Sequence, residues 1–138
     1  VPESDTCGVR ALVFLHGEYS HASHEGAMLV GEDTGEDASY TPEAMRPWEP
    51  SELEISAAKK IITEVRSLIP GRSMQSRPLL YARVDLVVRG DQTPLLMELE
   101  LVEPSLYAAL SPGALDRLAS AILREAAFGD DPHNDRLA

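Results

Sequence analysis

Four charged residues stand within the two apolar runs of the most hydrophobic segment of the chain, residues 79–107. Arg83 and Asp85 are two residues apart in one apolar run, and Glu98 and Glu100 are two residues apart in the next. Because side chains alternate between the faces of a strand, each pair would lie on one face of its strand, with the other face apolar. Three carboxylates beside one guanidinium can bind a divalent cation or retain a proton at a raised pKa.

One hairpin register brings these four charges together. The connection at residues 90–93 reads Gly-Asp-Gln-Thr and contains good turn residues. In a hairpin that is symmetric about this connection, Asp85 lies opposite Glu98 and Arg83 lies opposite Glu100. A slip of one residue would turn the charges towards the apolar core, so burial favours this register or one two residues away.

The charged face is open to three interpretations. Asp85 opposite Glu98 is an unfavourable pair of like charges, and Glu100 adds a third carboxylate that Arg83 offsets only in part. The cluster predicts a Mg²⁺ site, because Mg²⁺ binds one or two carboxylates together with substrate phosphates. A carboxyl group with a raised pKa is the second interpretation. The third is a solvent-facing sheet with a weak surface pair between Arg83 and Glu100.

Other segments predict the elements that position this hairpin. Residues 9–17 are apolar, rich in β-branched and aromatic residues and bounded by glycines, which predicts a buried strand. A turn at Gly17 leads towards a second strand. Ser51, with Glu54 three residues later, forms a capping box, and apolar residues at helical spacing continue from there towards Pro70.

The C-terminal part of the chain predicts a second helix. Residues 111–113 read Ser-Pro-Gly, and a helical pattern follows them and fades at Gly129. Its apolar face comprises Leu115, Leu118, Ala119, Ile122, Leu123 and Ala126. We expect one α+β domain over residues 1–129, an antiparallel β-sheet with two helices packed on one face, and a polar tail at 130–138. Residues 32–50 are rich in carboxylates and prolines and are expected to form an acidic flexible loop.

Composition argues against several classes of partner. The 138 residues carry a formal net charge of −11, and 43% of them are hydrophobic, which is enough for one core. A surface this acidic repels phosphate backbones and acidic lipids, so we expect no nucleic-acid and no membrane partner. The single cysteine, Cys7, cannot form an intrachain disulfide, and no apolar run reaches the ~20 residues that span a bilayer. We expect a cytoplasmic protein.

Two motif blocks stand out in the sequence. The first is YARVDLV followed by MELELVEPSLY, which contains the four charges, and the second is LVFLHGEYSHA at residues 12–22. Both resemble the C-terminal part of the ATP-grasp ligases, in particular the branch that includes the cyclo-ligase of cycloserine biosynthesis, where the second block is similar to a strand-turn-strand element. The resemblance covers nearly the whole chain and implies the C-terminal half of the ATP-grasp fold.

The resemblance also implies roles for individual residues. Asp85, Glu98 and Glu100 would bind the Mg²⁺ (or Mn²⁺) ions that hold the phosphates of ATP. Arg83 would be the catalytic residue that contacts the phosphates or the acyl-phosphate, and His21 would help to bind the nucleotide or substrate. The implied reaction activates a small carboxylate as an acyl-phosphate, for ligation to an amine or a related nucleophile.

The chain departs from the family pattern in two ways. Glu25 stands where the family usually has a basic residue, and an ATP-grasp enzyme is about twice as long. We therefore expect a fragment or half of the full enzyme that is incomplete for activity. It would pair with the missing N-terminal half or form a homodimer. The alternative is a non-catalytic ATP-grasp-like remnant or interaction domain that binds a metal or a partner chain.

Overall fold

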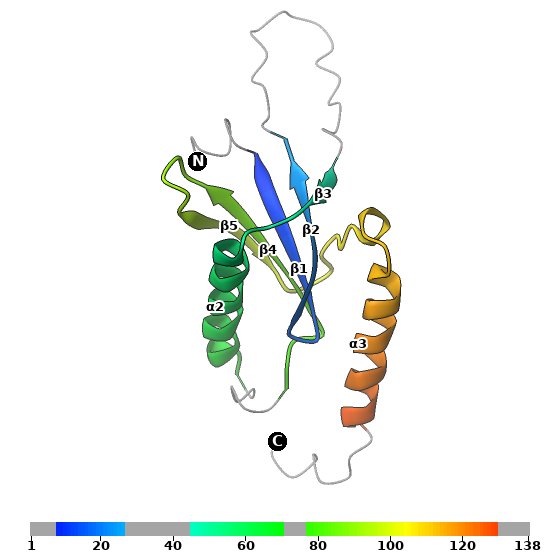
Figure 1. Ribbon diagram of the computed structural model, residues 1–138. Helices are drawn as coiled ribbons and strands as arrows, with labels where there is room; N and C mark the ends of the chain where they lie inside the picture. The colour runs from blue at the N-terminus through cyan, green and yellow to red at the C-terminus, as the bar shows by residue number, and fades with distance from the viewer. Residues whose placement is uncertain (1–7, 27–44, 71–76, 130–138) are drawn as a thin grey trace, which may run out of the picture.

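The computed structural model describes residues 8–26, 45–70 and 77–129, which form an antiparallel five-stranded sheet with two helices (Figure 1). The strands are β1 (Val9–Leu15), β2 (Glu18–Glu25), β3 (Arg46–Trp48), β4 (Tyr81–Val88) and β5 (Pro94–Glu100), in the spatial order β3-β2-β1-β4-β5. The helices are α2 (Glu52–Leu68) and α3 (Ala114–Gly129), and a short 3-10 helix η1 (Ala108–Leu110) precedes α3. The predicted α+β class is confirmed.

The helices do not pack on one face of the sheet as predicted. Leu12 and Phe14 of β1 form a buried cluster with Ile62 of α2, whereas Val13 and Leu15 pack with Ala121 of α3. Because neighbouring residues of a strand point to opposite faces, α2 and α3 cover opposite faces of the sheet. Figure 1 shows the two helices on either side of it. The sequence pattern did not separate the faces, because β1 is apolar on both.

Helix α2 begins where the sequence predicted. Ser51 is its N-cap, and the reciprocal hydrogen bonds between Ser51 and Glu54 complete the capping box. Glu54 is buried and also accepts a hydrogen bond from Nη1 of Arg10 at 2.9 Å. The cap therefore ties the start of α2 to strand β1. Lys59 and Lys60 are exposed, as the helical pattern predicted.

Two register shifts bend the sheet. Val13 pairs with His21 and Phe14 pairs with Tyr19, so Ser20 is an extra residue on β2. A similar shift between Asp85 and Leu86 leaves Met97 as the extra residue on β5. Bulges of this kind re-aim side chains at the edge of a site.

Two other expectations need correction. Arg46–Trp48 form β3 on the edge beside β2, so the described part of the predicted loop at 32–50 contains a strand. On α3, Leu115 and Leu123 are 68% and 71% exposed, so much of the predicted apolar face does not pack on the sheet. The polar tail at 130–138 lies outside the described residues. Within the described part of the chain, no helix is long and apolar enough to cross a membrane.

Candidate functional site

The hairpin register sets the four charges side by side on one face of the sheet. Asp85 pairs with Glu98 and Arg83 pairs with Glu100, as the sequence predicted. Arg83 also pairs with Val13 of β1, and Val13 packs with Ala121 of α3. The charges therefore lie on the face of the sheet that α3 covers, and α3 packs against the other end of that face. One carboxylate oxygen from each acidic residue lies within 4.8 Å of the others. The structure thus brings all of the predicted metal ligands together.

Arg83 links the acidic residues in this metal-free arrangement. Its Nε donates to Oδ1 of Asp85 at 2.9 Å, and its Nη2 donates to Oδ2 of Asp85 at 2.8 Å and to Oε1 of Glu100 at 2.5 Å. Its Nη1 donates to the backbone carbonyl of Ser105 at 3.3 Å. The interpretation as a weak, solvent-facing pair between Arg83 and Glu100 does not hold, because Arg83 is only 7% exposed and the side chain of Glu100 is 26% exposed.

Burial and charge oppose each other at this pair. Burial raises the pKa of Asp85, with a further increase from Glu98, and the hydrogen bonds and charge of Arg83 offset the rise only in part. Burial acts to lower the pKa of Arg83, but Asp85 and the neighbouring Tyr107 and Glu100 outweigh it, so the net shift is upward. Arg83 is therefore a fixed cation, and Asp85 gains from any further positive charge brought beside it.

The three acidic residues fit a Mg²⁺ or Mn²⁺ ion. All offer hard oxygen donors, and two oxygens on one Mg²⁺ lie at most roughly 4.2 Å apart because each Mg–O bond is about 2.1 Å. The three carboxylate oxygens lie within 4.8 Å of one another, which is close to that limit. Glu98 is exposed and Glu100 is half-buried, so both side chains have room to move closer.

The segment that follows β5 closes over this face. Arg83 contacts the carbonyl of Ser105, and its Cζ lies over the ring of Tyr107, 5.4 Å from the ring centroid. Burial raises the pKa of Tyr107, and the charges of Asp85, Glu25 and Glu100 add to the rise against the lowering effect of Arg83. The phenol thus stays protonated at neutral pH. The sequence motif contained Tyr107, but nothing in it indicated this contact.

His21 lies on the same face and fixes the position of that segment. Its Nε2 lies 2.7 Å from the carbonyl oxygen of Leu106, which can only accept, so Nε2 carries the proton. Its Nδ1 lies 2.8 Å from Oγ of Ser20, and that Oγ accepts from Nε of Arg117 at 2.8 Å. Burial lowers the pKa of His21, and Arg117 lowers it further, against the effect of the Leu106 bond. All of these hydrogen bonds are consistent with a neutral His21 whose Nε2 donates to Leu106 and whose Nδ1 accepts from Ser20.

Arg117 is a residue that the sequence did not single out. Besides Ser20 it contacts Oγ of Ser111 at 2.9 Å and the carbonyl of Pro112 at 3.2 Å. It thereby joins the bulge on β2 to the start of α3. Only its position on the polar side of a helical pattern was visible in the sequence, and that position is shared by many surface arginines.

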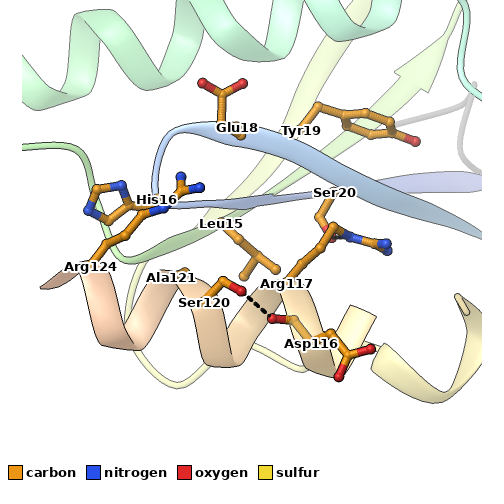
Figure 2. Close-up of a pocket in the computed structure, with 10 residues that line it drawn as sticks. All are labelled: Leu15, His16, Glu18, Tyr19, Ser20, Asp116, Arg117, Ser120, Ala121 and Arg124. Atoms are coloured by element: carbon orange, nitrogen blue, oxygen red, sulfur yellow. Dashed lines mark hydrogen bonds between the residues drawn. The ribbon is translucent and has the colours of Figure 1, made fainter. Parts of the chain in front are cut away.

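A cavity of about 290 Å³ lies between the β1–β2 hairpin and α3 (Figure 2). Ser20 of the hairpin and Arg117 of α3 both line it and are joined by the 2.8 Å hydrogen bond described above, whereas Glu18 and Tyr19 extend from the hairpin on the side away from α3. The cavity lining includes none of the three acidic residues. Among the described residues, the group of three acidic side chains close enough to hold a metal ion lies on the charged face and not in this cavity.

Comparisons with known proteins find similarity to part of a cycloserine biosynthesis protein and, in fold, to part of a D-alanine–D-alanine ligase. The chain is 34% identical over 122 residues to the cycloserine biosynthesis protein DcsG of Streptomyces lavendulae. The crystal structure of D-cycloserine synthetase DcsG superposes on 91% of the chain with a TM-score of 0.73 and 30% identity. D-alanine–D-alanine ligase from Bacillus anthracis, solved in complex with ATP, superposes on 89% of the chain with a TM-score of 0.50 and 15% identity, which supports the fold alone.

The matches cover most of this chain but only part of the known proteins. The aligned region is 88% of this chain and 39% of the DcsG sequence, and it is 40% of each of the two crystal structures. No protein-family model matches the chain. The similarity therefore concerns one portion of a longer enzyme.

Proposed function

We propose that this chain is part of an ATP-grasp ligase and that it forms the metal-binding wall of the nucleotide cleft. The enzyme would use ATP to activate a small carboxylate as an acyl-phosphate and would ligate it to an amine or a related nucleophile. The observation that carries the proposal is the gathering of Asp85, Glu98 and Glu100 around Arg83 on one sheet face. The similarity to DcsG supports it, because that protein is a synthetase.

Each residue of the charged face has a part in the proposal. Asp85, Glu98 and Glu100 would hold Mg²⁺ or Mn²⁺, which when bound would offset the negative charge of the ATP phosphates. Arg83 would contact the transferring phosphoryl group, since a guanidinium presents several N–H donors in one plane to phosphate oxygens. Its fixed position stabilises developing charge without reorganisation during the reaction.

His21 has a more limited part. Both of its ring nitrogens are already engaged, with Ser20 and Leu106. We propose that it acts near the nucleotide by holding the Leu106 segment in place. A direct contact with ATP would require it to give up one of these bonds.

The remaining wall of the cleft would come from another part of the enzyme. The chain spans about 39% of the length of DcsG, so we propose that it has little or no ligase activity alone. Its partners would then be the missing half of the enzyme, ATP and a small carboxylate, or a second copy of the chain. Since ATP-dependent ligation draws on the cellular nucleotide pool, we place this chemistry in the cytoplasm.

Metal titration tests the proposal. We expect the chain to bind Mn²⁺, measured by the loss of the free-ion signal in electron paramagnetic resonance, and to bind it more tightly with a non-hydrolysable ATP analogue. Glu98→Gln should weaken Mn²⁺ binding at least about tenfold, because it removes a direct ligand and losses of that size already follow from changes in outer-shell partners. Glu98 is exposed, so the substitution should not disturb the fold.

The control for this titration is Glu64→Gln, an identical change at an exposed position on α2. It should leave the affinity for Mn²⁺ unchanged. Equal Mn²⁺ affinity in Glu98→Gln and Glu64→Gln would reject the assigned ligands. Absence of Mn²⁺ binding by the unmodified chain, with or without nucleotide, would favour the alternative of a non-catalytic interaction domain.

A further inference from the structure

The guanidinium of Arg83 is held by two kinds of contact. Its N–H groups donate to Asp85, Glu100 and the carbonyl of Ser105, and these bonds occupy Nε, Nη2 and one position on Nη1. The ring of Tyr107 is a different partner, because its attraction depends on the positive charge and not on a particular N–H group. The ring contact can therefore persist when the hydrogen-bond partners of the guanidinium change.

Tyr107 reaches Arg83 because of an uncommon backbone conformation. Its φ and ψ are 49° and 33°, in the left-handed region, and Glu103 of the same segment has a φ of 52°. Residues other than glycine seldom adopt this region, since the Cβ approaches the backbone. Such a conformation persists only where the surroundings determine it.

Contacts on both sides of Tyr107 hold it there. On the N-terminal side, the carbonyl of Leu106 accepts from Nε2 of His21 at 2.7 Å. On the C-terminal side, Oγ of Ser111 accepts from Nη2 of Arg117 at 2.9 Å. Strand β2 and helix α3 thus fix the segment from opposite directions, and the ring of Tyr107 is carried over the guanidinium between them.

These contacts assign Tyr107 a role in the proposed reaction. Resting on the proposed function, we propose that Tyr107 is a positioning residue that keeps the Arg83 guanidinium in place while Arg83 exchanges carboxylate oxygens for phosphoryl oxygens. When a cation binds the carboxylates, Arg83 loses some of its hydrogen bonds to Asp85 and Glu100. The ring of Tyr107 and the carbonyl of Ser105 are the contacts that do not compete with that cation.

Two substitutions separate the ring from the hydroxyl and from the backbone. Tyr107→Asn removes the ring but suits the backbone, because asparagine tolerates the left-handed conformation better than most residues. Tyr107→Phe keeps the ring and removes only the hydroxyl. Tyr19→Leu is the control, since Tyr19 packs edge-on against Phe14 on the opposite face of the sheet and makes no contact with Arg83.

The first measurement uses the metal-free chain. Buried Arg83 should give a slowly exchanging Nε–H signal in ¹H–¹⁵N NMR spectra. We expect exchange with solvent to become about fivefold faster in Tyr107→Asn, the size that corresponds to the loss of one cation–π contact, and to be unchanged in Tyr107→Phe and Tyr19→Leu. Unchanged exchange in Tyr107→Asn overturns the proposal, as does an effect of Tyr107→Phe equal to that of Tyr107→Asn.

The second measurement is the affinity for Mn²⁺ with a non-hydrolysable ATP analogue. The Tyr107→Asn variant should bind the complex of Mn²⁺ with the ATP analogue about fivefold more weakly than the unmodified chain. Its affinity for Mn²⁺ without nucleotide should equal that of the unmodified chain. Tyr107→Phe should bind the complex as tightly as the unmodified chain. Equal nucleotide affinity in Tyr107→Asn and the unmodified chain overturns the positioning role. Failure of the unmodified chain to bind nucleotide would instead count against the proposed function, and the exchange measurement, which needs neither metal nor nucleotide, would still decide whether Tyr107 positions Arg83.

Discussion

At the scale of single residues, Arg83 and the proposed metal ion would compete for the same oxygens. Arg83 uses both carboxylate oxygens of Asp85 and one of Glu100, which are two of the three proposed metal ligands. A cation that binds there must therefore displace the guanidinium from part of its contacts. Arg83 compensates the charge of the buried Asp85 in the absence of metal, and under the proposed function it would become available to a phosphate group once a metal ion binds.

This competition predicts opposite effects of Arg83→Gln on stability and on metal binding. Loss of the guanidinium leaves Asp85 buried without a counter-ion, so the free energy of unfolding without metal should fall by about 3 kcal/mol. In the absence of nucleotide, Mn²⁺ should bind the Arg83→Gln variant more tightly than it binds the unmodified chain. Added Mn²⁺ should therefore raise the unfolding free energy of the variant by more than that of the unmodified chain. Urea unfolding with and without Mn²⁺ measures both effects.

The control for this prediction is Arg89→Gln, which removes an exposed arginine next to the hairpin turn. It should change the unfolding free energy by less than about 0.5 kcal/mol. If the Arg83→Gln variant binds Mn²⁺ no more tightly than the Arg89→Gln variant, the prediction that Arg83 competes with the metal ion for the carboxylates is wrong.

At the scale of elements, the pairing of the charges was predictable because the alternation of apolar and charged residues selects one parity. Next to the turn, Val88 pairs with Pro94 and Leu86 pairs with Leu96, a register that would place Asp85 opposite Met97. The bulge at Met97 shifts the register by one residue and so restores the predicted pairing of Asp85 with Glu98. The bulge at Met97 was not predictable, because an extra residue leaves the alternation of the charged pair intact. The contact between Tyr107 and Arg83 was hidden for a different reason: it depends on a left-handed backbone position fixed by β2 and α3.

Helix α3 shows where helical periodicity is insufficient. The helix docks on the sheet through small residues, with Ala114 and Ala121 almost fully buried, while Leu115, Ile122 and Leu123 are exposed. Small residues allow a helix to approach a sheet closely, but they contribute little to an apolar pattern that is weighted by large side chains. The sequence therefore predicted the helix correctly and the packed face wrongly.

The capping box of α2 carries a pH-dependent prediction. Burial acts to raise the pKa of Glu54, but its hydrogen bonds with Ser51 and Arg10 outweigh burial, so its pKa lies below the ordinary 4.5. A lowered pKa in the folded state adds stability above the unfolded value, and that stability is lost as the pH falls through the lowered value. Glu54→Gln should therefore reduce the unfolding free energy by about 2 kcal/mol at neutral pH, and by progressively less below pH 4.5.

Urea unfolding followed by the fluorescence of Trp48, the single tryptophan, measures this difference at several pH values. Glu52→Gln in the same first turn is the control, because Glu52 is exposed and should show a small effect. A difference between Glu54→Gln and the unmodified chain that does not shrink below pH 4.5 would contradict the assigned role of Glu54.

At the scale of the whole molecule, one face of α3 packs against the sheet and the other face is exposed. The apolar stripe of α3 comprises Leu115, Ala119, Ile122, Leu123 and Ala126, all of them exposed. Its members recur at helical spacing, so they form a continuous surface and not scattered apolar residues. Helix α3 lies at the outside of the sheet in Figure 1, where the described part of the chain leaves this stripe uncovered.

The stripe predicts self-association of the isolated chain, because pairing two copies along α3 buries both stripes at once and a symmetric interface needs only one self-complementary patch. We expect the mass measured by light scattering to rise with protein concentration. Leu123→Glu should return the chain to a monomer, since it places a charge in the centre of the contact, whereas Glu64→Gln on the exposed side of α2 should not change the mass. A mass equal to that of the monomer at every concentration would show that a second copy does not cover the stripe. The next candidate partner for the stripe would then be the part of the enzyme that corresponds to the 61% of DcsG that this chain does not match.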